Sequence, residues 1–230
     1  MATYVLIPGA GGDSWYWHRV VPLLEALGHD VVAVDLPAAD PSAGLTEYAD
    51  AVVDQVGDHA DLIVVAQSLA GFTAPLVCDR LPVELIVLLN AMAPAPHESA
   101  GEWWGNTGHS EARAELAARQ GWASTDFDTM RDFFHDVPQD VIAEAMALGE
   151  PAQSDGPFGR PWPLGEWPDV PTRFLQSTDD RFFPVEFQRR VVRDRLGIPV
   201  DEMPGGHLVA LSRPDELVQR LESYREEQKL

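Results

Sequence analysis

Short apolar runs alternate with longer amphipathic stretches along much of the chain. Within each run the residues are apolar at consecutive positions, which is typical of strands buried on both faces in a parallel sheet. Clear runs lie at 4–7, 31–34, 62–65 and 85–89, and strand-like composition returns at 172–176 and 200–203. Helices are predicted at 22–28, 45–56 and 214–226, where proline, glycine and the i, i+3, i+4 spacing mark starts, stops and apolar faces. This alternation predicts an α/β protein with a doubly wound, mostly parallel sheet.

The middle of the chain breaks this pattern. Residues 94–168 contain no convincing strand, and two helices are predicted there, near 110–119 and 138–148. Five of the seven tryptophans lie in this segment, which is too aromatic for a disordered linker. We therefore expect residues 1–93 and 169–230 to form the core of the protein, with 94–168 inserted over the sheet.

Composition limits the classes of function. With 230 residues, 45% of them hydrophobic, the chain can bury one full core. The 37 acidic against 16 basic residues give a formal charge of −21, which repels phosphate backbones and anionic bilayers, so neither nucleic acid nor a membrane is an expected partner. The single cysteine, Cys78, excludes an internal disulfide and a cysteine-based zinc site. No basic leader precedes the first predicted strand, and we expect a cytoplasmic protein.

A serine follows the third predicted strand, at the kind of position where open α/β sheets place their binding sites. Small residues stand two before and two after Ser68, at Ala66 and Ala70, and would permit a sharp strand-to-helix turn that exposes the hydroxyl above the sheet. The common form of this turn, G-x-S-x-G, has glycine at both places, so the turn here is more crowded. An ordinary helix N-cap serine is the alternative interpretation.

Two later loops carry partners for such a serine. Asp179 and Asp180 follow the strand at 172–176, and His207 follows the strand at 200–203 on a glycine turn. A carboxylate can orient a histidine, which can then act as a base toward the serine. Taken singly, either aspartate is better explained as a turn residue, and the histidine as an exposed loop residue. Together they stand in the chain order Ser, Asp, His that one large class of hydrolases uses.

Several segments carry a family resemblance. They are Gln67-Ser68-Leu69, Asp180–Pro184 with 186–188, Gly206-His207-Leu208 with 214–217, and the opening Val5–Gly12 with 15–18 and 23–29. These segments resemble the α/β-hydrolase superfamily, and within it the small esterases grouped with plant methylesterases and hydroxynitrile lyases. The likeness covers the sheet at both ends of the chain and is weak over 94–168. It implies an α/β-hydrolase fold in which 94–168 forms a helical cap.

The resemblance also implies roles, residue by residue. Ser68 would be the nucleophile, His207 the general base and later acid, and Asp180 the carboxylate that fixes the histidine tautomer. Asp179 is the alternative acid, because the two aspartates are adjacent. The backbone N–H groups of Ala10 and Leu69 would form the oxyanion hole. The implied enzyme is a carboxylesterase that needs no cofactor and no metal ion.

Three departures from the family pattern bear on efficiency. Pro8 stands where the family usually has a histidine that braces the oxyanion loop, and Gln67 replaces the usual residue before the nucleophile, which is often histidine. Pro75 would fall inside the helix predicted after Ser68, at a cost of roughly 3 kcal/mol unless that helix kinks. None of the three removes a catalytic group.

Other functions fit the sequence less well. The hydroxynitrile lyases of this group use a threonine beside the oxyanion loop and a lysine after the histidine, where this chain has Gly9 and Leu208. A dinucleotide-binding G-x-G-x-x-G frame starting at Gly9 would need glycine where Ser14 stands. A non-catalytic ligand-binding protein on the same fold would have no need of His207.

The expected substrate follows from the aromatic content of the middle segment. Part of it would line an apolar pocket over the serine, and the pocket candidates are Gly9, Gln67, Trp103 and Trp104. We expect a small, uncharged or weakly polar ester with a hydrophobic acyl or alcohol part, because the charge of −21 discourages anions. A homodimer is compatible with the sequence.

Overall fold

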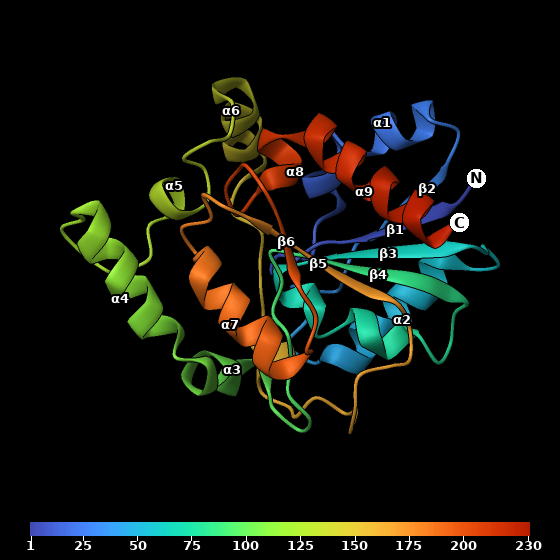
Figure 1. Ribbon diagram of the computed structural model, residues 1–230, viewed down its shortest axis with the longest axis horizontal. Coiled ribbons are helices and arrows are strands. Elements are labelled where there is room, and N and C mark those ends of the chain that lie inside the picture. Colours follow the sequence, from blue (N-terminus) through green and yellow to red (C-terminus); the bar gives the residue numbers. More distant parts are fainter.

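Six parallel strands form one sheet in the order β2-β1-β3-β4-β5-β6. The computed structural model describes residues 1–230 (Figure 1). The strands are β1 Thr3–Ile7, β2 Asp30–Ala33, β3 Leu62–Gln67, β4 Val83–Leu89, β5 Thr172–Ser177 and β6 Val200–Met203. Each of the six predicted strands is confirmed, and so is the prediction of an α/β protein with a doubly wound parallel sheet.

The central strands are buried on both faces, as their continuous apolar sequences predict. Every residue of β1 and of β3 is buried. Because successive side chains of a strand point to opposite faces, Tyr4 and Leu6 join one hydrophobic cluster and Val5 and Ile7 join another. The sheet therefore separates two cores, one on each face.

Helices cover both faces of the sheet (Figure 1). One face carries α1 Val21–Ala26, α8 Val209–Ser212 and α9 Pro214–Gln228, and the other carries α2 Leu45–Val56 and α7 Val185–Arg195. The amphipathic pattern of α2 is confirmed, since its buried positions are Leu45, Tyr48, Ala49, Val52 and Val56. Chain order reverses between β1 and β3, and the carboxyl ends of strands beside such a reversal form the crevice in which open sheets bind ligands.

Four helices lie between β4 and β5, beyond the carboxyl ends of the strands (Figure 1). They are α3 Ala100–Thr107, α4 His109–Gln120, α5 Thr129–Asp132 and α6 Gln139–Leu148, followed by a 3-10 turn, η4 Gly156–Phe158. The sequence predicted α4 and α6 but neither α3 nor α5. Ser99 begins α3 with a capping box, and the buried ion pair between Arg113 and Asp132, 2.8 Å, holds α4 against α5. None of the helices in the molecule is both long and apolar enough to cross a bilayer.

The segment after Ser68 differs from the predicted helix. Two short 3-10 helices replace it, η2 Ser68–Gly71 and η3 Ala74–Val77. Pro75 lies in the first turn of η3, where a backbone N–H would have no intrahelical partner. The prediction of one continuous helix after Ser68 is therefore wrong, and the cost expected for a proline inside an unbroken helix does not arise. A third 3-10 helix, η1 Ser14–Trp17, follows the turn after β1.

Candidate active site

Ser68 occupies a strained turn at the end of β3. Its φ of 52° lies in the left-handed region, which a non-glycine residue adopts at a cost of about 1–3 kcal/mol when the surrounding structure enforces it. Its neighbours Ala66 and Ala70 are fully buried, and the Ser68 backbone carbonyl accepts a hydrogen bond from the N–H of Met92, 2.9 Å. The turn is thereby held, and the side-chain hydroxyl faces a cavity.

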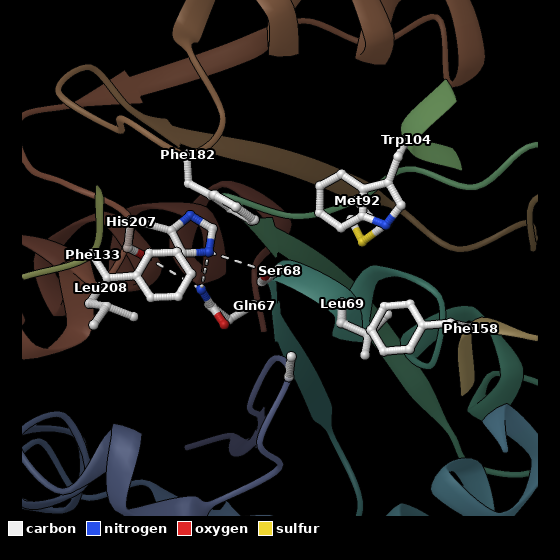
Figure 2. A pocket seen from close by; sticks show the side chains of 11 residues that line it. Gln67, Ser68, Leu69, Met92, Trp104, Phe133, Phe158, Phe182, His207 and Leu208 are labelled. Atoms are coloured by element: carbon white, nitrogen blue, oxygen red, sulfur yellow. Dashed lines mark hydrogen bonds between the residues drawn. The ribbon is translucent and has the colours of Figure 1, made fainter. Parts of the chain in front are cut away.

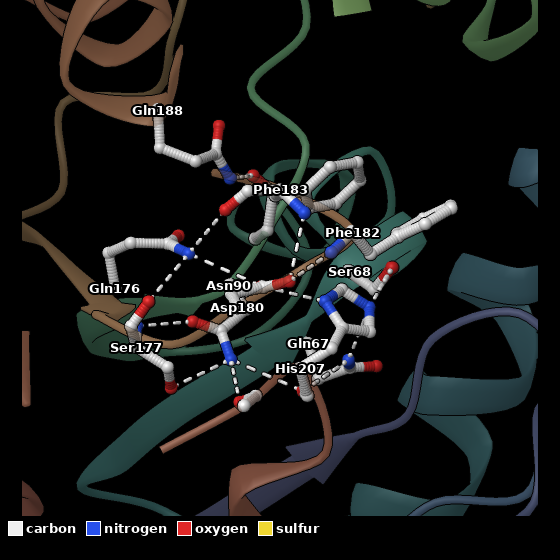
Figure 3. Close-up of polar contacts among 12 residues, drawn as sticks. Gln67, Ser68, Asn90, Gln176, Ser177, Asp180, Phe182, Phe183, Gln188 and His207 are labelled. Carbon is white, nitrogen blue, oxygen red and sulfur yellow. Dashed lines mark hydrogen bonds and ion pairs between the residues drawn. The ribbon is translucent and has the colours of Figure 1, made fainter. Parts of the chain in front are cut away.

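His207 lies between Ser68 and Asp180 (Figure 3). The Nδ1–Oδ2 distance to Asp180 is 2.8 Å, and the Nε2–Oγ distance to Ser68 is 3.2 Å. All three side chains are buried. Since the carboxylate can only accept, Nδ1 carries the proton of the neutral ring and Nε2 carries the lone pair that faces the serine. Residues far apart in sequence thus form one hydrogen-bonded chain.

Asp180, and not Asp179, contacts the histidine. The N–H groups of Phe182 and Phe183 both donate to Oδ1 of Asp180 at 2.8 Å, which fixes the carboxylate in the turn before α7. Asp179 is exposed, and its side chain accepts instead from the N–H of Gly205, 3.2 Å. The geometry therefore separates two residues that the sequence left as alternatives.

Asn90 holds the loop that carries His207, a role that no feature of the sequence indicated. It ends β4 with a φ of 45° and is fully buried. Its Nδ2 donates to the carbonyl oxygens of Gly206 and His207, 3.1 and 3.2 Å, and to Oγ of Ser177, 3.0 Å. Its Oδ1 accepts from the N–H of Ser177, 2.7 Å. One side chain thus ties the ends of β4 and β5 to the histidine loop.

The turn after β1 packs directly against the serine. A Cβ added at Gly9 would lie 2.8 Å from Cβ of Ser68 and 2.3 Å from Oε1 of Gln67, so only glycine fits there. The next residue, Ala10, and Leu69 both line the cavity at Ser68. The N–H of Ala10 has no hydrogen-bond partner within the protein.

The cavity over Ser68 measures about 120 Å³ and is mainly apolar. Figure 2 shows its side chains on both sides of the serine. The lining residues are Ala10, Gln67, Ser68, Leu69, Met92, Trp104, Phe133, Phe158, Phe182, His207 and Leu208. Two of the four pocket candidates, Gln67 and Trp104, are among them, whereas Gly9 and Trp103 are not.

Trp103 belongs to the core instead of the cavity. Its ring is fully buried, its Nε1 donates to the carbonyl of Ala93, 3.0 Å, and it packs against Phe183 and Phe187. Trp104, the next residue of α3, points to a different side of that helix, because successive helical residues are about 100° apart. A pair of tryptophans in the sequence cannot show which of the two faces a ligand.

Aromatic rings enclose the histidine and its surroundings. Phe133 stacks on the ring of His207, with centroids 4.8 Å apart and planes 13° apart. Nearby, burial among aromatic rings lowers the pKa of His109 to about 4, and this histidine donates through Nε2 to the carbonyl of Phe182, 2.8 Å. His109 is therefore uncharged at neutral pH. No three His, Cys, Asp or Glu side chains are grouped to hold a metal ion.

Comparison with known proteins decides the family. The chain matches the model of the alpha/beta hydrolase family over residues 4–220. It belongs to the alpha/beta hydrolase family. Among relatives of this hydrolase, a probable esterase, PIR7A, of Oryza sativa subsp. japonica is 28% identical over 255 residues, covering 93% of each chain. The pyrethroid hydrolase of Sphingobium wenxiniae is 25% identical and covers 96% of this chain and 86% of its own.

Other similar proteins extend the range of named activities. An alpha-hydroxynitrile lyase of Arabidopsis thaliana is 25% identical to this alpha/beta hydrolase over 245 residues, covering 95% of each chain. The crystal structure of polyneuridine aldehyde esterase superposes with a TM-score of 0.76 at 20% identity, over 97% of this chain and 99% of that one. At that identity the structural likeness bears on the fold.

Proposed function

We propose that this alpha/beta hydrolase is a serine esterase that cleaves a small, uncharged carboxylic ester through an acyl-enzyme intermediate. The observation that carries the proposal is the unbroken hydrogen-bonded chain from Asp180 through His207 to Ser68, which ends in an apolar cavity. Relatives named as esterases and hydrolases support the same reaction class.

In the proposed mechanism, Oγ of Ser68 attacks the ester carbonyl while Nε2 of His207 takes the hydroxyl proton. The negative charge that develops on the carbonyl oxygen is stabilised by the N–H groups of Ala10 and Leu69. His207, whose charged form is stabilised by Asp180, then returns the proton to the departing alcohol as the C–O bond breaks. Water attacks the acyl-enzyme by the same route and releases the acid. Loss of one oxyanion donor costs about 10²–10³-fold in kcat in related chemistry.

The cavity bounds the part of the ester that it can hold. An apolar cavity of about 150 Å³ accommodates benzene, so a cavity of about 120 Å³ suits an acyl or alcohol group no larger than a small ring or short chain. No Lys, Arg, Asp or Glu lines it, so a charged group would be buried there without a partner. We also propose that residues 94–168 act as a cap, because Trp104, Phe133 and Phe158 reach the cavity from this segment.

A p-nitrophenyl ester series from acetate to octanoate tests the proposal. We expect the highest kcat/KM with short acyl chains, and a loss of about 10⁴-fold or more in kcat for Ser68→Ala, His207→Ala and Asp180→Asn. Asp179→Asn is the matched control, since it changes the adjacent carboxylate and should retain most activity. Equal losses at both aspartates, or full activity in Ser68→Ala, would contradict the mechanism.

A further inference from the structure

Gln67 contacts the catalytic atoms without belonging to the proposed triad. It is buried at the end of β3, and its Nε2 lies 3.2 Å from Nε2 of His207 and 3.4 Å from the His207 carbonyl oxygen (Figures 2 and 3). Apart from Ser68 and His207, it is the one polar side chain that lines the cavity.

The chemistry of its neighbours fixes which way the Gln67 amide points. The His207 carbonyl oxygen can only accept a hydrogen bond, so the NH₂ group must face the histidine. The amide oxygen then faces the turn after β1, where it fills the space that a side chain at Gly9 would need. Gln67 is thus wedged between the oxyanion loop and the general base.

Two donors therefore compete for one lone pair. Nδ1 of His207 donates to Asp180, which leaves a single acceptor site on Nε2 of the neutral ring. Oγ of Ser68 and Nε2 of Gln67 both lie 3.2 Å from that atom. A hydrogen bond donated to the neutral form of a base opposes proton uptake, because the bond is lost when the proton arrives.

We propose that Gln67 is a positioning residue that lowers the proton affinity of His207 by donating to its Nε2 lone pair. The kinetic part of this inference rests on the proposed function, since proton affinity controls the rate only if His207 is the general base. When Nε2 takes the serine proton, Gln67 keeps its contact with the His207 carbonyl and gives up the one with the ring.

Other titratable or charged groups lie near His207 or near its neighbours Asp180 and Phe182, and a substitution at residue 67 leaves each of them in the sequence. They are Asp179, Asp180 and Arg181 before α7, His109 and Arg113 on α4, His135 and Asp136 between α5 and α6, and Tyr16 on η1. Variants at position 67 therefore isolate the effect of the amide.

The test is an NMR titration of the His207 ring in protein labelled at histidine, assigned with His207→Asn. Gln67→Asn keeps an amide too short to reach the ring, and we expect the titration midpoint to rise by about half a pH unit, the lower range for one hydrogen bond. Gln67→Glu replaces the donor with an acceptor, and we expect a rise of about one unit or more. A midpoint that stays in place or falls in Gln67→Asn overturns the inference.

A parallel pH profile of kcat/KM separates this inference from the proposed function. We expect the acid limb to move with the NMR midpoint in both variants. A merely structural role would lower kcat and leave the limb where it is in the wild type. Shifted NMR midpoints in a wild-type protein that hydrolyses no ester would defeat the proposed function alone, whereas unshifted midpoints in an active esterase would defeat the role of Gln67 alone.

Discussion

Replacing Asn90 with alanine should damage both stability and the histidine loop. The side chain is fully buried, and its removal leaves the N–H of Ser177 and the carbonyl oxygens of Gly206 and His207 without this partner. Each buried polar group left unpaired costs about 1–3 kcal/mol. Alanine at a φ of 45° adds roughly 1–2 kcal/mol of backbone strain. Because the His207 carbonyl keeps its hydrogen bond from Gln67, we take the lower end of these ranges and expect Asn90→Ala to lose about 4–6 kcal/mol of unfolding free energy. That is a large part of the 5–15 kcal/mol typical of a domain.

Urea unfolding measures this loss, and two further variants divide it. Asn90→Gly removes the same hydrogen bonds without the strain, so it should be more stable than Asn90→Ala by roughly 1–2 kcal/mol. The chain's other asparagine, Asn106, is exposed and donates one hydrogen bond to Glu98, so Asn106→Ala should cost about 0.5 kcal/mol or less. An Asn90→Ala protein within about 1 kcal/mol of the wild type would refute the reasoning, because it would mean that these contacts contribute no net stability.

Three further changes test other parts of the molecule. Burial lowers the pKa of His109 to about 4, so between pH 6.5 and 4 the unfolded chain binds more protons than the folded protein. The free energy of unfolding should therefore fall by about 3 kcal/mol as the pH drops through that window. In His109→Gln, the free energy of unfolding measured with urea should depend less steeply on pH. Gly71→Ala would place a Cβ 1.9 Å from the carbonyl oxygen of Met92 and should disrupt the serine turn and esterase activity, whereas Gly105→Ala, in open space on α3, should leave kcat/KM unchanged. Trp104→Ala enlarges the cavity, so the preferred p-nitrophenyl ester should become longer by several carbons, toward octanoate. An unchanged preference for chain length would mean that the Trp104 side chain does not contact the bound ester.

The local sequence pattern was sufficient to predict the strands of the sheet and the edge at which the candidate catalytic residues meet. Continuous apolar runs, such as 4–7 in β1 and 62–66 in β3, are typical of strands buried on both faces, which indicates central strands of a parallel sheet. In such a sheet the carboxyl ends of neighbouring strands share one edge, so residues that follow β3, β5 and β6 meet there. The meeting of Ser68 and His207 with one of the two aspartates, Asp179 or Asp180, was predictable for this reason.

Contacts between distant segments could not be predicted in the same way. Asn90 contacts the histidine loop because its amide reaches across β5, and nothing in the surrounding sequence distinguishes it from an ordinary strand-end asparagine. Phe158 lines the cavity because residues 94–168 fold back over the sheet, and Met92 lines it because the segment after β4 is hydrogen-bonded to the Ser68 carbonyl. The segment after Ser68 contains two 3-10 helices because Pro75 begins a new helical turn there. From the sequence alone, a proline at this position is compatible with a kinked helix or with the start of a new one.

The most direct test of the account is labelling of the purified protein with a fluorophosphonate, read by intact mass and peptide mapping. An activated serine reacts with this reagent, and an ordinary buried serine does not. We predict a single adduct on Ser68 that is absent from His207→Ala and strongly reduced in Asp180→Asn, with Asp179→Asn labelled like the wild type. No adduct in a protein whose fold is confirmed by circular dichroism, or an adduct that persists without His207, would contradict the serine mechanism and favour a non-catalytic ligand-binding protein on this fold.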